Sequence, residues 1–107
     1  MIKLVGFQIQ SGNFTNKDTG EVVNWSNCLL RTVTDENLLA GEYGQKIGET
    51  KVKSEYIASS LGVTAFDCSP NKITEVIQAL QKCINRNITF NLTLVKGNYC
   101  ISGIKVQ

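Results

Sequence analysis

Apolar and polar residues alternate along five segments of the chain, and apolar residues recur at helical spacing along a sixth. The alternating segments, each predicted to be a β-strand, are residues 2–14, 22–34, 45–57, 88–95 and 99–106. The helical segment spans residues 70–85, between the third and fourth strands. Ser69 is a good N-cap for this helix, and Pro70 occupies the favoured first helical position.

Three strands, one helix and two strands follow one another in the order of an OB-fold. We therefore predict an all-β dominated chain, a five-stranded OB-fold Greek-key barrel with one α-helix between strands 3 and 4. Gly6 and Gly103 lie inside strands and predict bulges. Turn residues at 16–21 and 96–98 predict hairpins, residues 35–44 predict a loop or short helical turn, and no regular structure is expected at 58–67. OB-folds commonly bind oligonucleotides on strands two and three and the neighbouring loops.

Length and composition favour one folded domain over residues 1–107. The chain is 42% hydrophobic and 19% charged, which argues against disorder. The strand pattern begins at once, without an export signal, and no segment approaches the ~20 apolar residues of a membrane span. We therefore expect a cytoplasmic protein with no membrane partner.

The residue types present do not support catalysis by the common routes. The chain has no histidine, which removes the usual proton shuttle, and it has no phosphate-binding glycine motif. Cys28, Cys68, Cys83 and Cys100 are widely spaced, without a CxxC pair, and are expected to be reduced and mostly buried thiols. A Cys83 nucleophile activated by Lys82 is the alternative, although Cys83 lies near the apolar stripe of the helix. We expect no enzyme, no catalytic residue, no metal and no cofactor.

Aromatic and basic residues meet on the predicted second and third strands. Trp25 and Arg31 share one parity of the second strand, while Lys51 and Lys53 share one face of the third, its expected antiparallel neighbour. Binding of single strands needs aromatic rings to stack on bases and cations to follow phosphates, so a net charge of +2 suffices if the cations are clustered. The candidate nucleic-acid-binding residues are Trp25, Arg31, Lys51, Lys53, Tyr56, Phe14, Lys17, Lys96 and Tyr99.

Several of these candidates also have a purely structural interpretation. A lone tryptophan in a small barrel is often a core anchor, so Trp25 either stacks on bases or packs inside. Tyr56 shares its parity with Val52, which favours packing. Lys51 and Lys53 are flanked by glutamates, as on a solvated, ion-paired face.

Parts of the first half of the chain resemble a known family. The start MIKLVGF, the long first hairpin with its Lys and Gly, and the strand VVNWSNCLLRTV are similar to the small single-stranded-DNA-binding proteins of phages and plasmids, including the helix-destabilising protein of filamentous phages. The resemblance implies a cytoplasmic OB-fold homodimer that coats replication or transfer intermediates without sequence preference. The chain departs from this family by a full helix before its last hairpin. It also lacks the acidic, Gly-rich C-terminal tail through which cellular single-strand binders recruit partners, so such recruitment is not expected.

The predicted function is non-enzymatic, sequence-independent binding of single-stranded DNA. RNA is a close alternative ligand, because stacking and backbone charge do not distinguish the sugars. The rival hypothesis is a protein-interaction module, an inhibitor or assembly subunit that docks through a strand edge or a helix face. A third, weaker hypothesis is a cysteine-dependent or metal-dependent activity.

Overall fold

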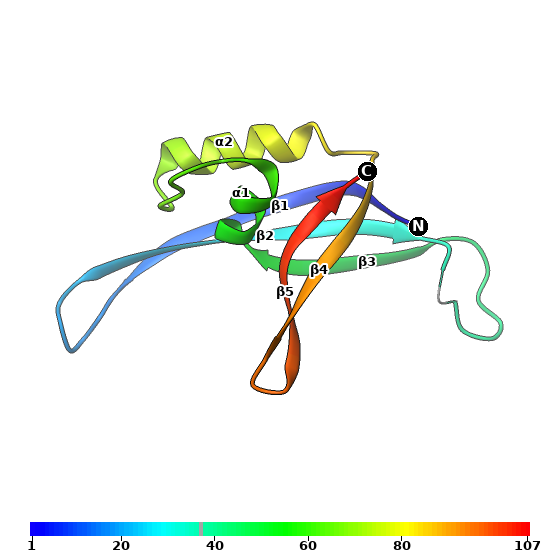
Figure 1. The fold of residues 1–107 in the computed structure, drawn as a ribbon, viewed down its shortest axis with the longest axis horizontal. Coiled ribbons are helices and arrows are strands. Elements are labelled where there is room, and N and C mark those ends of the chain that lie inside the picture. The colour runs from blue at the N-terminus through cyan, green and yellow to red at the C-terminus, as the bar shows by residue number, and fades with distance from the viewer. Residues whose placement is uncertain (37) are drawn as a thin grey trace.

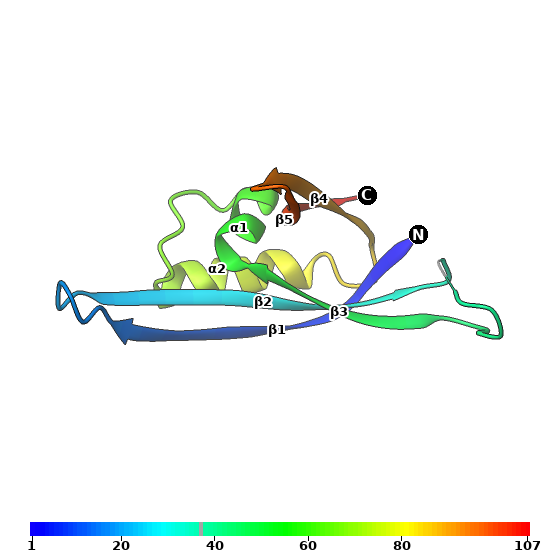
Figure 2. The same cartoon turned by 90° about the horizontal axis from the view of Figure 1, so that it is seen from below.

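Five antiparallel strands form one sheet that curves around two helices (Figures 1 and 2). The computed structural model describes residues 1–36 and 38–107. Its elements are β1 (Ile2–Thr15), β2 (Val22–Thr34), β3 (Lys46–Lys53), α1 (Ser54–Leu61), α2 (Pro70–Gln81), β4 (Asn87–Val95) and β5 (Asn98–Val106). The strand order in the sheet is β3-β2-β1-β4-β5. The chain is therefore all-β dominated, as predicted. Neither described helix has the length and apolar content needed to cross a membrane.

The curvature of the sheet comes partly from two irregularities in strand pairing. The register of β1 against β2 shifts between Leu4 and Gly6, and the register of β4 against β5 shifts beside Gly103. Both register shifts lie beside a glycine at which the sequence predicts a bulge, Gly6 or Gly103. A bulge bends and twists the strand that contains it. The sheet stays open, because its edge strands β3 and β5 share no paired residues in the described part of the chain.

The core lies inside the curve of the sheet, where α1 contacts β2, β3, β5 and α2. Along β2, Ser26, Cys28 and Leu30 point into this core while the residues between them point outward. The largest buried apolar side chains come from β1, β2, α1, α2 and β4, and they are Leu4, Leu30, Ile57, Leu80, Ile88 and Val76. The helix stripe predicted from the sequence thus supplies part of the core.

The connection after the third strand differs from the prediction. Strand β3 ends at Lys53 rather than at residue 57, and α1 occupies part of the segment that was expected to lack regular structure. Ser54, Ile57 and Ala58 are all buried, and their spacing places them on one side of a helix. Gly62 then ends α1 with a φ of 81°. Two helices, rather than one, therefore lie between strands 3 and 4.

The second helix begins where predicted and ends earlier. Ser69 caps it, because its Oγ accepts a hydrogen bond of 3.4 Å from the Lys72 amide. Helix α2 ends at Gln81, four residues before the predicted limit, and Asn85 turns the chain toward β4 with a φ of 70°. The predicted loop at 35–44 precedes β3, and its residue Asn37 lies outside the described residues.

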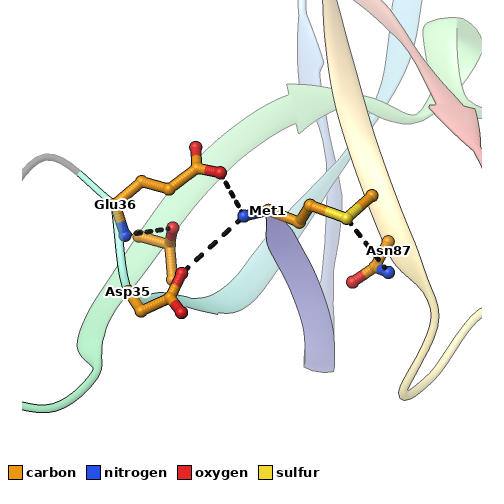
Figure 3. Close-up of polar contacts among 5 residues, drawn as sticks. Met1, Asp35, Glu36 and Asn87 are labelled. Atoms are coloured by element: carbon orange, nitrogen blue, oxygen red, sulfur yellow. Dashed lines mark hydrogen bonds and ion pairs between the residues drawn. The ribbon is translucent and has the colours of Figure 1, made fainter.

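The first residue is tied to the loop after β2 (Figure 3). The Met1 amine donates a hydrogen bond to the Glu36 carboxylate and lies 3.8 Å from Asp35 Oδ1, and the bond to Glu36 raises the pKa of the amine. Asn87 Nδ2, on β4, donates to Met1 Sδ over 3.7 Å. These groups are exposed, so water and salt screen their attraction.

Gly103 lies where α1 crosses β5, and we expect Gly103→Ala to destabilise the fold by about 1–3 kcal/mol. A Cβ at this position would lie 2.5 Å from Ser60 Oγ. That hydroxyl is held in place, since it donates to the Tyr56 carbonyl at 2.8 Å and accepts from the Ile104 amide at 3.0 Å. Urea denaturation of the wild type and of Gly103→Ala measures the difference in the free energy of unfolding. In the control Gly6→Ala the added Cβ meets nothing within 4 Å, so equal losses in both variants would contradict the proposed clash.

Candidate nucleic-acid interface

The outer face of β2 and β3 brings four of the predicted residues together. Pairing of β2 with β3 sets Lys53 beside Asn27, and directly paired residues project from the same face of a sheet. Because side chains alternate along each strand, Lys51 and Arg31 share this face with Trp25. This outer face is opposite to the face that carries the core.

Trp25 is not a buried core anchor, because 39% of its surface is exposed. Its paired residue on β1 is Gly12, and a Cβ at Gly12 would lie 2.8 Å from Trp25 Cζ2. The indole therefore lies against the β1 backbone in space that only glycine leaves free. Gly12 was not among the candidate residues. The signal that points to it is a glycine inside a strand, which often marks a close approach by another group.

A first cleft, which we call the Trp cleft, lies at the point where β3 ends and β2 continues. Its volume is about 310 Å³. Its lining residues are Asn24, Trp25, Ser26, Asn27, Lys53, Glu55 and Cys68. The pairing of β2 with β3 reaches only to Asn27, so no described strand pairs with this side of residues 22–26. The cleft thus combines an aromatic ring, a cation, a carboxylate and amide groups beside a free strand edge.

A second cleft, the Tyr cleft, separates β3 and α1 from the β4–β5 hairpin. Its volume is about 510 Å³, and its lining residues are Lys51, Val52, Lys53, Tyr56, Val95, Tyr99, Cys100 and Ile101. Four of the predicted residues therefore line one cleft. The sequence predicted Tyr56 to lie on the third strand, but it belongs to α1. Lys53 Nζ lies 5.9 Å from the centre of the Tyr56 ring. Tyr99 is 73% exposed.

The three other candidates lie on or near the hairpin tips. Phe14 is exposed and, through its pairing with Val23, shares the outer face near the tip of the β1–β2 hairpin. Lys17 lies in the turn of that hairpin, and Lys96 in the turn of the β4–β5 hairpin, and neither residue lines the two clefts. Both hairpins extend beyond the body of the protein (Figure 1). Five of the nine candidate residues therefore line the two clefts, and these three do not.

The cations of the outer face differ in how they are held. Arg31 Nε lies 3.5 Å from a carboxylate oxygen of Glu49, and Arg31 Nη2 donates to Gln8 Oε1 over 3.4 Å. Lys51 and Lys53 are exposed, and neither takes part in the ion pairs found within the described residues. The ion-paired interpretation of these two lysines therefore has no support. Two ammonium groups are accessible to an anionic ligand.

The buried cysteines are poorly suited to nucleophilic chemistry. Burial raises the pKa of the Cys28 and Cys83 thiols, so the reactive thiolate is disfavoured. Burial also raises the pKa of Cys68, while Cys100 is exposed on β5. The described residues contain no group of three or more histidine, cysteine or acidic side chains that could hold a metal ion.

Comparisons of the chain with protein-family models, with curated proteins and with solved structures found no match.

Proposed function

We propose that this chain binds single-stranded DNA on the outer face of β2 and β3, as a non-enzymatic protein with an OB-fold. The strand order supports this fold, since an OB-fold is a five-stranded and partly open barrel whose second and third strands carry the ligand. Membership of the small single-strand-binding proteins of phages and plasmids, a cytoplasmic role in coating DNA intermediates and a homodimeric state are parts of the same proposal. RNA stays an alternative ligand.

The observation that carries the proposal is that Lys53 lines both clefts. It shares the Trp cleft with Trp25, and it shares the Tyr cleft with Tyr56, Tyr99 and Lys51. A single strand that runs from the outer face over the unpaired edge of β3 stacks one base on the indole and another on the tyrosines of α1 and β5, and the lysines contact the phosphates between them. Each stacked base contributes about 1–3 kcal/mol to binding.

Fluorescence titration with oligothymidylate tests the proposal. Trp25 is the only tryptophan of the chain, so its emission reports on the Trp cleft alone. At low salt we expect the oligonucleotide to quench this emission, and we expect added salt to reverse the quenching because phosphate contacts are weakened. An unchanged emission at low salt, together with no mobility shift of a labelled oligonucleotide, would contradict the proposal.

The two free lysines give a quantitative prediction. For single strands, each phosphate neutralised contributes about 0.7 to the slope of log K against log salt. We therefore expect the double variant Lys51→Gln/Lys53→Gln to lower this slope by about 1.4 when affinity is measured across a salt series. Lys105→Gln is the control, because Lys105 is exposed on β5 but lines neither cleft. Equal slopes in the wild type and the double variant would remove these lysines from the interface.

The exposed end of the β4–β5 hairpin favours a second candidate function, a protein-interaction module. Leu92 and Leu94 are 59% and 60% exposed and share a face with Tyr99 and Ile101. On β4 these side chains continue the row that begins with the buried Ile88, but they extend past the core into solvent. Exposed apolar surface of this kind is typical of protein contacts. The proposed homodimer would use Leu92 and Leu94 of this hairpin, which line neither cleft.

Sedimentation velocity tests the homodimer. We expect a dimer that dissociates in the double variant Leu92→Ser/Leu94→Ser. A wild-type protein that stays monomeric at all concentrations would exclude a homodimer through this hairpin.

A further inference from the structure

We propose that the edge of β1 that faces away from β2 is a self-association surface, on which the same edge of a second copy of the chain adds as an antiparallel strand. This inference goes beyond the proposed function and does not rest on it. It concerns the backbone groups of residues 5–15, which we call the β1 edge, and neither cleft takes part.

The β1 edge is open in the structure. Strand β4 pairs with this side of β1 only at Ile2 and Lys3, and the segment before β4 forms backbone hydrogen bonds with Leu4. Beyond Leu4, no further backbone hydrogen bond reaches this side of the strand within residues 1–36 and 38–107. None of residues 5–15 is buried. Figure 2 shows α2 on the inner side of the β1–β2 ribbon, with the edge of β1 on the outside.

Alternate residues of β1 direct their backbone groups toward this edge. The Asn16 amide donates to the Glu21 carbonyl over 2.7 Å, and the pairing of β1 with β2 continues from there without a register shift as far as Gly6. The even-numbered residues 8–14 therefore bond to β2, while the odd-numbered residues 7–13 direct their N–H and C=O groups away from it. Such an edge is complementary to itself, because a two-fold rotation brings donors of one copy to acceptors of the other.

The side chains of the β1 edge do nothing to keep a second copy away. Residues 4–16 include no charged residue and no proline. The free edge strand β3 differs, since its eight residues include Lys46, Glu49, Lys51 and Lys53. Lysines on an edge strand oppose pairing with another chain. A second copy brings the same uncharged residues, so no register of β1 against β1 sets like charges opposite each other. The β1 edge thus suits a copy of itself, and the β3 edge does not.

This contact is separate from the one proposed for Leu92 and Leu94 on the β4–β5 hairpin. A copy can use both surfaces, because residues 5–15 and the hairpin belong to different strands. The β1 edge contributes main-chain hydrogen bonds and uncharged side chains, and each such hydrogen bond stabilises only modestly. We therefore expect edge pairing at higher protein concentration than the hairpin contact.

Sedimentation velocity of the variant Leu92→Ser/Leu94→Ser isolates the β1 edge, because the hairpin contact is removed. We expect this variant to change from monomer to dimer as its concentration rises. Adding Ser11→Pro removes one edge amide from each copy, so two hydrogen bonds are lost and the Kd of the dimer should rise about 5- to 150-fold. Adding Ser11→Ala instead keeps the amide and should leave the Kd within about 2-fold. Circular dichroism checks that both triple variants are folded.

Backbone hydrogen exchange tests the same contact without a substitution in the edge. In Leu92→Ser/Leu94→Ser, the amides of the odd-numbered residues 7–13 should exchange fast at low protein concentration and slowly once dimers form. The amides of the even-numbered residues 8–14 bond to β2 and should exchange slowly at both concentrations. A variant that stays monomeric at every concentration would overturn the inference. Dimers in which the odd-numbered amides still exchange fast, or an equal Kd in the folded proline and alanine variants, would overturn it as well.

Discussion

Replacing Trp25 with alanine is expected to weaken the binding of oligothymidylate about 5- to 150-fold. This range corresponds to the loss of one stacked base, about 1–3 kcal/mol. The variant has no tryptophan, so binding is measured by the anisotropy of a labelled oligonucleotide. The fold should be retained, because the indole is partly exposed on the outer face and contributes little to the core.

Two further variants test whether stacking is the cause of that loss. Trp25→Phe keeps an aromatic face and should retain most of the affinity. Gly12→Ala keeps the indole but places a Cβ 2.8 Å from its Cζ2, so the ring must move and the affinity should fall to an intermediate value. Wild-type affinity in Trp25→Ala would show that the indole does not contact the bound strand.

Replacing Leu80 with alanine is expected to lower the free energy of unfolding by about 2–5 kcal/mol. Leu80 is fully buried on α2 and packs in the core beneath the sheet. Such a cost is a large part of the stability of a small domain, about 5–15 kcal/mol. Urea denaturation followed by circular dichroism provides the measurement.

The next residue of α2 offers a matched control. Gln81 is exposed, and Gln81→Ala should change stability by less than about 0.5 kcal/mol. Similar small changes in both variants would mean that α2 does not close the core, contrary to the arrangement in Figure 2.

Much of the secondary structure could be predicted because its signals are local. The limits of β2 were predicted without error, and the start of α2 followed from its cap and its proline. Helix α1 was missed because Val52, Ser54 and Tyr56 continue the alternation of β3 across the helix boundary. In that stretch the two periods overlap, and only the packing against β5 and α2 decides between them.

The site was predictable in its residue types but not in its shape. Both faces of β2 carry apolar residues, so its parity alone did not reveal whether Trp25 points inward or outward. The clefts join residues far apart in sequence, such as Trp25 with Cys68 and Lys51 with Tyr99. Such neighbours depend on the curvature of the whole sheet, which a local pattern does not encode. The same holds for Gly12, whose role becomes visible only through its pairing with Trp25.

Chemical-shift mapping by nuclear magnetic resonance tests most directly the claim that a nucleic acid crosses the outer face of β2 and β3. Titration with oligothymidylate at low salt should shift the indole N–H of Trp25 and the amides of Lys51, Lys53 and Tyr99. The amide of Leu80, in α2, should stay unchanged. Shifts confined to α2, or no shifts at any oligonucleotide concentration, would contradict the account.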